Sequence, residues 1–550
     1  MMNLTKIASV LLLLVGSTGA AYAAAQNAIV TGEVDLQSFD QASTPFVISA
    51  TYNPRLGVTV VKVDADAKAD AQSLFDGMGL SYEWDREYRR DIAPSTDVYR
   101  GAVQSQANKF TDPRLAEQTE LSSQLNNMLD GMNYQRVRTG DTNVLLMDVG
   151  ALPHEDVVFS GGYSFVSEPV VAERLPSDYA DYTGQSVGQC VSGHGLTMAG
   201  IIGATQNNQF GIAGVANAHL YMGRVMQTNC DNPSAPFDYG TLLDLADGLV
   251  AASDGVDAAI PIPDVVYIGL SVAGACPSYL QNGINRLNDK GVIVVAPAGN
   301  DGIQVSGFSP ANCTGVVVVG SHTEQADSSA YSNTGGQVDV TALGARLTTL
   351  KNGGYGVIDS TDAAAAAVAG YAALIKEQFP LITSDKAEYI LKKSSNPYPT
   401  GSGCTTQCGS GMVSVLKGLK MAEKLIDPKI TFSHAFVRPA DTACEVSNEF
   451  SSLSTVMDTC NALRADVKVN YATGDNPVDY KIKAFYRPVG TASWLPLNNE
   501  LAPKAANEVL AMPNTKLDDD AYGVAACDGD DCPFVQTVFK SNIVYPAGCN

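Results

Sequence analysis

The chain has 550 residues, and its hydrophobic fraction of 45% is enough for two to four folded units. Asp and Glu total 58 against 35 Lys and Arg, which gives a formal net charge of -23. Such an acidic surface repels phosphate backbones and anionic lipids, so the composition argues against nucleic acid and membrane surfaces as partners.

Residues 1–23 have the features of an export signal. A short polar segment containing Lys6 precedes an apolar stretch, and Ala21-Tyr22-Ala23 forms a small-residue site for signal peptidase. No later stretch approaches the roughly 20 uninterrupted apolar residues that span a bilayer. We therefore expect a secreted or periplasmic protein without a membrane span, and we expect it to be a monomer.

Residues 45–110 have the pattern of a small α+β unit. The run VTVVKV at 58–63 predicts a strand, AKADAQSLFDGMG predicts a helix that stops at Gly79, and LSYEW predicts a second strand. The stretch 111–134 is polar and helix-prone, and it has the composition of a linker.

Residues 135–425 alternate short β-branched runs with helical segments. The runs are NVLLMDVG, AHLYMGRVM, DVVYIGLSV, GVIVVAPAGN and GVVVVGS. Apolar runs of this length indicate strands buried on both faces, and the intervening helices imply parallel crossovers. We predict a doubly wound α/β domain, in which function collects beyond the carboxyl ends of the strands. Asp148, Ser271 and Asn300 lie at such ends.

Residues 427–550 have a β pattern and predict a β-sandwich-like domain. Strands VKVNY and YKIKAFYRP flank a TGDNP turn, and YGVAACDGDDCPFVQTVF reads as a hairpin. The acidic tip of that hairpin could hold calcium loosely, but a solvated turn explains it more simply.

Eleven cysteines in an exported chain favour disulfides. Ten of them form pairs of neighbours along the sequence, Cys549 is left over, and the connectivity stays open at this point. The neighbouring pairs are Cys190 and Cys230, Cys276 and Cys313, Cys404 and Cys408, Cys444 and Cys460, and Cys527 and Cys532.

In chain order, the motifs of residues 135–425 resemble the subtilisin-like serine proteases, or subtilases. NVLLMDVG resembles the strand of the catalytic aspartate, GHGLTMAGIIGA the helix of the catalytic histidine, and VIVVAPAGNDG the loop of the oxyanion-hole asparagine. The resemblance gives these roles to Asp148, His194 and Asn300. GLSVAG resembles the substrate-cleft edge, made by Ser271, Val272, Ala273 and Gly274.

The same resemblance covers parts outside the catalytic motifs. It implies that residues 45–110 are an inhibitory propeptide, which makes the chain's own N-terminal unit one of its partners. The pairs Cys190 with Cys230 and Cys276 with Cys313 resemble bridges of exported subtilases. No cofactor is expected, and whether a structural calcium ion is present cannot be derived from the residues.

The nucleophile position departs from the subtilase pattern. The family serine stands six residues before a Val-Ala-Gly landmark, and counting back six residues from Val368 reaches Asp362. Using Ser360 instead would need two extra helical residues, which rotates the helix face by about 200°. An aspartate carboxylate cannot pass a proton to His194 as a serine hydroxyl does, so peptide hydrolysis of the usual kind should be lost.

Asp362 has two interpretations. As the N-cap of the alanine-rich helix it would stabilise the helix by about 1 kcal/mol, and this is the simpler reading. Alternatively, its carboxylate points into the oxyanion hole near Asn300 and occupies the site. A metal held by Asp148, His194 and Asp362 is a third idea, which the spacing of these residues does not favour.

Three functions follow from these observations. The leading hypothesis is an exported, catalytically inactive subtilisin-like protein whose cleft binds a peptide or protein ligand. The second is an active secreted serine endopeptidase that uses Ser360 or Thr361 as its nucleophile. The third is a structural or adhesive surface protein that acts through the β domain at 427–550.

Overall fold

The computed structural model describes a long central part of the chain, with gaps, and isolated strands nearer the C-terminus. The described residues are 25–34, 39, 44–91, 110–123, 125–126, 128–134, 142–167, 179–180, 191–229, 237–256, 259–380, 382–404, 407–426, 430–439, 463–471, 481–488, 495–501, 509–515, 519–527 and 536–540. The segment expected to be an export signal, 1–23, lies outside them.

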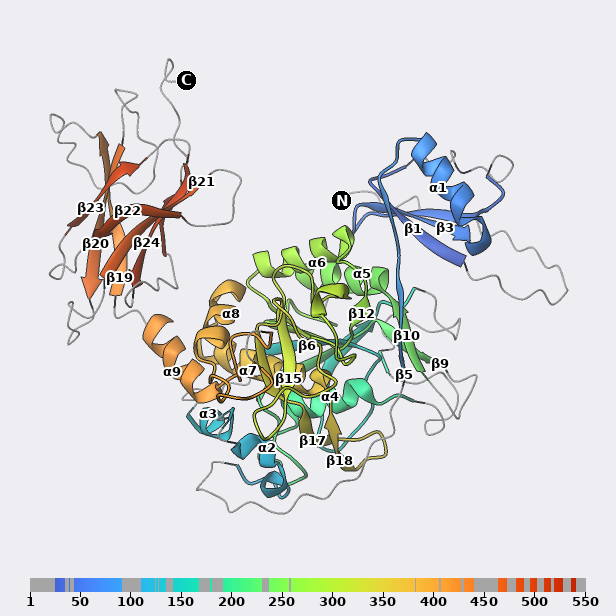
Figure 1. Ribbon diagram of the computed structural model, residues 1–550, viewed down its shortest axis with the longest axis horizontal. Helices are drawn as coiled ribbons and strands as arrows, with labels where there is room; N and C mark the ends of the chain where they lie inside the picture. The colour runs from blue at the N-terminus through green and yellow to red at the C-terminus, as the bar shows by residue number, and fades with distance from the viewer. Residues whose placement is uncertain are drawn as a thin grey trace, which may run out of the picture. The chain divides into compact units, whose positions relative to one another are not determined.

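The N-terminal unit is a four-stranded antiparallel sheet with one main helix (Figure 1). Val61 and Val63 share one face of their strand and pack with Phe75 of the helix, because alternate strand residues point to the same side. The sheet starts at Ala25, whereas the sequence predicts a unit that begins at residue 45. Its elements are β1 (Ala25–Thr31), β2 (Val47–Asn53), β3 (Val58–Asp64), η2 (Ala65–Ala67), α1 (Lys68–Gly77) and β4 (Tyr82–Trp84).

A seven-stranded parallel sheet forms the centre of the second unit, in the order β16-β15-β13-β11-β6-β8-β7. Strand β6 lies inside the sheet, and later strands extend the sheet from it in both directions, as in a doubly wound fold. The predicted α/β architecture is therefore confirmed. The strands are β6 (Asn143–Asp148), β7 (Phe159–Ser164), β8 (His219–Arg224), β11 (Val265–Ile268), β13 (Ile293–Pro297), β15 (Val317–His322) and β16 (Val340–Leu343).

Helices pack against this sheet (Figure 1). Of the described helices, α7 is the most deeply buried. Its alanine run is fully buried, and small side chains let the helix approach β11, β13, β15 and β16 closely. The helices are α4 (His194–Gly203), α5 (Leu242–Asp254), α6 (Ser278–Asp289), α7 (Thr361–Gln378), α8 (Ser384–Lys393) and α9 (Val415–Ile426).

Residues 111–134 are not a linker, which corrects the prediction from their polarity. The segment folds into η3 (Leu115–Glu117), α2 (Thr119–Ser122) and α3 (Met128–Tyr134). Its buried apolar residues, Leu115, Leu121, Met128 and Met132, belong to the main hydrophobic core. Asn126 is fully buried and donates from Nδ2 to the carbonyl oxygen of Val413 over 2.8 Å.

Three small sheets complete the second unit up to residue 426. They are β5 (Glu87–Asp91) with β10 (Phe237–Thr241) and β9 (Met226–Asn229), β12 (Val272–Ala273) with β14 (Phe308–Ser309), and β17 (Ala345–Thr349) with β18 (Tyr355–Asp359). A single turn, η4 (Val305–Gly307), precedes β14.

The C-terminal residues form two antiparallel sheets, in agreement with the predicted β domain. The predicted strands VKVNY and YKIKAFYRP lie in different sheets, as β20 and β21. The predicted hairpin is present as β24 paired with β25. One sheet contains β19 (Ile430–Pro439), β20 (Leu463–Tyr471) and β23 (Val509–Thr515), and the other β22 (Leu495–Leu501), β21 (Lys481–Pro488), β24 (Asp519–Cys527) and β25 (Gln536–Lys540).

Candidate active site

Asp148 is the last residue of β6 and is fully buried. Its Oδ1 accepts a hydrogen bond of 2.7 Å from the backbone nitrogen of Val149. Gly269, just beyond β11, makes the space for this carboxylate, since a Cβ at that position would collide with Asp148 Oδ2. The carboxyl ends of two neighbouring strands therefore form the pocket for one buried charge.

His194 is the first residue of α4 and lies against Asp148. Its Nδ1 is 2.8 Å from Asp148 Oδ2 and 3.0 Å from Oδ1, so the carboxylate fixes the plane of the imidazole. Gly193 precedes the helix with φ of 77°, a left-handed conformation that suits glycine. This turn starts α4 at the residue that faces Asp148.

A second buried carboxylate supports the start of α4, and sequence reasoning missed it. Asp238 of β10 is fully buried and accepts hydrogen bonds from Ser192 Oγ at 2.7 Å and from Thr228 Oγ1 at 2.9 Å. Ser192 lies two residues before His194, so strand β10 is tied to the turn that precedes the histidine. A lone Asp in FDYGT gives no sequence signal for this role.

Asn300 follows β13 and contacts the first turn of α7. Its Oδ1 accepts from both the backbone nitrogen and the hydroxyl of Thr361, each at 2.8 Å. The backbone nitrogen of Gly299 donates to the same Thr361 hydroxyl over 3.2 Å. Because Oδ1 is held by Thr361, the Asn300 amide nitrogen is directed the other way, towards Asp362.

Asp362 is the second residue of α7, and 6% of its surface is exposed. Asn300 Nδ2 donates to Asp362 Oδ2 over 2.8 Å, while Asp362 Oδ1 lies 4.0 Å from His194 Nε2. His194 therefore has a carboxylate on each side, one in hydrogen-bond contact and one beyond it. The N-terminus of α7 adds a favourable partial positive charge near Asp362.

Asp362 does not cap α7, so the simpler of its two interpretations is wrong. Ser360 is the N-cap, and its Oγ accepts a hydrogen bond of 3.1 Å from the backbone nitrogen of Ala363. The preceding residue, Asp359, accepts a hydrogen bond from Tyr331 Oη. Burial, aided by this carboxylate, raises the pKa of Tyr331. The half-buried Tyr331 hydroxyl thus anchors the chain just before the helix.

The cleft-edge residues assigned from sequence lie beyond β11. Ser271 follows that strand, and its buried Oγ has no hydrogen-bond partner among the described residues. Val272 and Ala273 form β12, which pairs antiparallel with β14 on one side. Gly274 has φ of 126°, which favours glycine.

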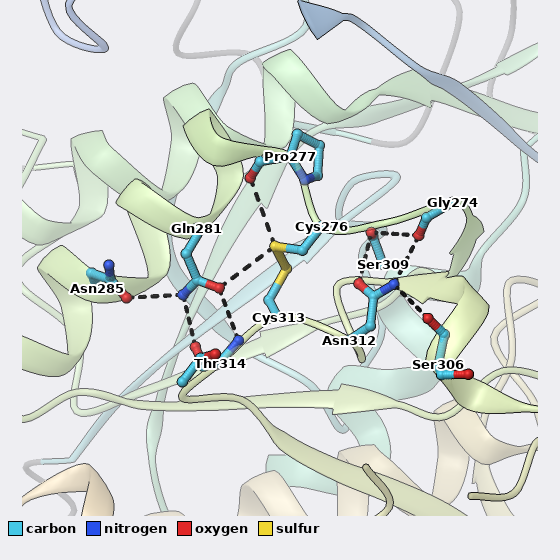
Figure 2. The surroundings of a disulfide bond; sticks show 10 residues. All are labelled: Gly274, Cys276, Pro277, Gln281, Asn285, Ser306, Ser309, Asn312, Cys313 and Thr314. Atoms are coloured by element: carbon cyan, nitrogen blue, oxygen red, sulfur yellow. Dashed lines mark hydrogen bonds between the residues drawn. A yellow bond between two sulfur atoms is a disulfide. The ribbon is translucent and has the colours of Figure 1, made fainter. Parts of the chain in front are cut away.

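A disulfide joins the chain just after β12 to the loop after β14 (Figure 2). The Cα atoms of Cys276 and Cys313 are 5.2 Å apart, a distance that suits a disulfide. This pair is one of the neighbouring cysteine pairs named from the sequence. The carbonyl oxygen of Gly274 accepts from Ser309 Oγ at 3.0 Å and from Asn312 Nδ2 at 2.9 Å. These contacts hold Gly274 against β14 and the loop that follows it.

Cys404 and Cys408 form a second disulfide, with Cα atoms 5.6 Å apart. The other proposed pairs cannot be placed, because at least one side chain of each lies outside the described part of the chain. These are Cys190 with Cys230, Cys444 with Cys460, and Cys527 with Cys532.

Strand β5 borders β10, and Tyr88 is its buried anchor. The Tyr88 side chain is 5% exposed, and its Oη donates to the carbonyl oxygen of Val225 over 2.9 Å. Gly240 of β10 leaves room for the ring, since a Cβ there would lie 2.6 Å from Tyr88 Oη and 2.5 Å from Val225 O. The edge of β10 therefore already carries an extended segment of the same chain.

Within the described ranges, no group of three or more His, Cys, Asp and Glu side chains is arranged to hold a metal ion. The same part of the chain contains no helix that is long and apolar enough to cross a membrane.

Comparisons with curated proteins find extracellular and alkaline proteases. An "Extracellular protease" of Xanthomonas campestris pv. campestris is 30% identical over 332 residues, which is 55% of this chain and 55% of that protein. "Alkaline elastase YaB" of Bacillus sp. is 30% identical over 275 residues, which is 49% of this chain and 62% of that protein. The chain thus matches roughly half to two thirds of the length of these relatives.

Solved structures of proteases share the fold. A protease from Pseudoalteromonas arctica is 32% identical with a TM-score of 0.50, covering 57% of this chain and 100% of that one. The epidermin leader peptide processing serine protease of Staphylococcus aureus, at 22% identity, has a TM-score of 0.53 over 72% of this chain and 98% of its own. The sequence model described as the Subtilase family matches residues 116–411. The chain therefore belongs to the subtilase family.

Proposed function

We propose that this protein is a subtilase in which Asp362 stands at the nucleophile position, and that it acts by binding an extended peptide or protein segment rather than by serine-type hydrolysis. The contact between Asn300 Nδ2 and Asp362 Oδ2, at 2.8 Å, carries this proposal. Asn300 is the one side chain that the sequence assigned to the oxyanion hole. In the structure its amide is directed at a carboxylate of the protein itself.

The chemistry of this arrangement opposes peptide cleavage. A serine hydroxyl gives its proton to a histidine as it attacks, and donors then stabilise the oxyanion. A carboxylate has no such proton, and attack on an amide by Asp362 would produce a mixed anhydride. The negative charge held by Asn300 also repels the oxyanion that the amide donor would otherwise stabilise.

Two features support retention of a binding cleft. The outer edge of β12, at Val272 and Ala273, is supported from behind by β14 and the Cys276–Cys313 disulfide. Strand β10 pairs with β5, an example of an extended segment bound by strand addition. We propose that a peptide or protein ligand also binds by strand addition. We further propose that residues 45–110 act as a propeptide-like unit, which stays attached because the chain cannot cleave itself.

The sequence of residues 1–23 and the names of the relatives support export. The relatives from Xanthomonas and Bacillus are an extracellular protease and an alkaline elastase. We propose that this chain is likewise secreted or periplasmic.

An active peptidase is the second candidate, because the relatives are named as proteases. It would need Ser360 or Thr361 as nucleophile. The contacts oppose both, since Ser360 Oγ caps α7 at Ala363 and Thr361 Oγ1 donates to Asn300 Oδ1. Within the described part of the chain, neither hydroxyl forms a hydrogen bond with His194.

The decisive experiment compares the full-length wild type with Asp362→Ser and Asp362→Ala. Each purified protein is incubated with a fluorophosphonate probe and, separately, with a mixed peptide substrate. We expect no labelling and no cleavage for the wild type and Asp362→Ala, and labelling at residue 362 for Asp362→Ser. Labelling of the wild type that disappears in Ser360→Ala or Thr361→Ala would establish the active peptidase instead.

A further inference from the structure

The carboxylate of Asp362 has the partners needed for a different covalent reaction. One oxygen, Oδ2, is held by the Asn300 amide at 2.8 Å, and the other, Oδ1, lies towards His194 Nε2 at 4.0 Å. His194 is in turn oriented by Asp148 at 2.8 Å. The side chain of Asp362 keeps 9% of its surface exposed and that of His194 17%, so solvent reaches the gap between them.

We propose that this site hydrolyses small neutral epoxides through an ester on Asp362. This activity goes beyond the proposed binding of peptides and does not depend on it. A carboxylate is a poor nucleophile towards an amide, but it displaces an oxygen from a strained sp³ carbon and forms a stable alkyl ester. Hydrolysis of that ester requires a general base, which His194, oriented by Asp148, supplies.

The first step is ring opening. Asp362 Oδ1 attacks one ring carbon, a new C–O bond forms, and the bond from that carbon to the ring oxygen breaks. The freed alkoxide remains attached through the second carbon and takes a proton from solvent. An epoxide suits the site better than an alkyl halide, because its leaving oxygen stays tethered and needs no separate anion site; the Asn300 amide is already engaged by Oδ2.

The second step is hydrolysis of the ester. Atoms 4.0 Å apart are too far for a direct hydrogen bond but close enough for one water to contact both, so His194 Nε2 can take a proton from a water that attacks Asp362 Cγ. The carbonyl oxygen of the ester is Oδ2, where Asn300 stabilises the negative charge that develops. Collapse releases the diol, which takes the proton from His194, and Asp362 loses its remaining proton to solvent. The sum is epoxide plus water giving a diol.

The experiment uses the full-length protein and para-nitrophenyl glycidyl ether as the epoxide. In water labelled with heavy oxygen, the wild type should form the diol, and the peptide containing Asp362 should gain heavy oxygen, because water attacks Cγ rather than the epoxide carbon. His194→Gln should accumulate one probe per chain on Asp362, with the ester lasting about a hundredfold longer because its general base is gone.

Two variants separate this reaction from general alkylation of acidic residues. Asp362→Asn should give neither ester nor diol. Asp301→Asn, which changes an exposed carboxylate near Asn300, should behave as the wild type. The wild-type measurement needs no variant to fold: absence of heavy oxygen at Asp362 of the wild type overturns the proposal. An adduct spread equally over other acidic residues also overturns it.

Discussion

Asn300 and Asp362 are joined by a 2.8 Å hydrogen bond from amide nitrogen to carboxylate oxygen, across the start of α7. The same Asn300 side chain accepts twice from Thr361, so its orientation is fixed from both ends. The pair therefore couples the loop after β13 to the N-terminus of the central helix, whatever the site does chemically.

This coupling can be measured with a double-mutant cycle of Asn300→Ala and Asp362→Ala. We expect an interaction free energy of about 1–2 kcal/mol, because Asn300→Ala leaves the nearly buried Asp362 carboxylate without its donor, whereas Asp362→Ala leaves the amide of the exposed Asn300 to water. Thermal unfolding of the full-length chain gives the required stabilities. The control Asp301→Ala, at an exposed neighbour, should change stability by about 0.5 kcal/mol or less. Purely additive single changes would contradict the coupling.

The cap of α7 gives a second prediction. Ser360→Ala should lower the free energy of unfolding by about 1 kcal/mol, because the backbone nitrogen of Ala363 loses its acceptor. Ser360→Asp should restore most of this stability, since Asp is an equally good cap and its charge suits the helix N-terminus. Melting temperatures of the three proteins test the assignment. If Ser360→Ala melts with the wild type, Ser360 is not the cap.

His322 predicts a dependence of stability on pH. Burial, opposed by the carbonyl of Thr323 and aided by Arg346, lowers the pKa of His322 to about 4. Its Nδ1 donates to the Thr323 carbonyl oxygen at 2.9 Å, and its Nε2 then accepts from Asn126 Nδ2 at 3.3 Å, a contact that a second ring proton would oppose.

The unfolded chain binds this proton near pH 6.5, whereas the folded chain does not until about pH 4. Stability is therefore full above pH 6.5 and falls as the pH drops through this window, by about 3 kcal/mol in total. Denaturant unfolding at several pH values should show a flatter profile for His322→Gln. His219→Gln, which changes an exposed histidine, should keep the wild-type slope. Equal slopes for all three proteins would exclude His322 as the source.

Gly240 gives a test of the β5 contact. Gly240→Ala should loosen β5, because the added methyl group would lie 2.6 Å from Tyr88 Oη and 2.5 Å from Val225 O. Hydrogen exchange at residues 87–91 should speed up, while Gly336→Ala, at a site with open space around it, should leave that exchange unchanged. Protection at 87–91 that survives Gly240→Ala would show that Tyr88 does not anchor the strand.

The parallel sheet could be predicted because its strands are long apolar runs, and polar residues such as Asp148 and Asn300 follow or end these runs. Asp148 ends β6 and Asn300 follows β13, so these two site residues follow from strand boundaries, whereas His194, the first residue of α4, was identified only through the resemblance to subtilases. The cap assignment could not be made this way. Ser360, Thr361 and Asp362 are all acceptable caps, and only the backbone conformation of Ser360 decides among them.

Other features were hidden by composition. Leu115, Leu121, Met128 and Met132 lie in a segment whose overall polarity favoured a linker, yet they are buried in a core that they share with helices much later in the chain. Tyr88 and Asp238 gave no signal, because their roles depend on Val225 and Ser192, which lie far from them in sequence. Contacts at long range are what a single sequence conceals.

The buried amide of Asn126 has a consequence for how the molecule is made. It bonds to Val413, 287 residues further along, and its own carbonyl oxygen accepts from the backbone nitrogen of Val415. During synthesis, which starts at the N-terminus, the segment around α3 therefore lacks these late contacts. They can form only after almost the whole subtilase region has been made. Closure of the domain is thus a late, non-local event, which slows folding and prolongs the exposure of apolar surface.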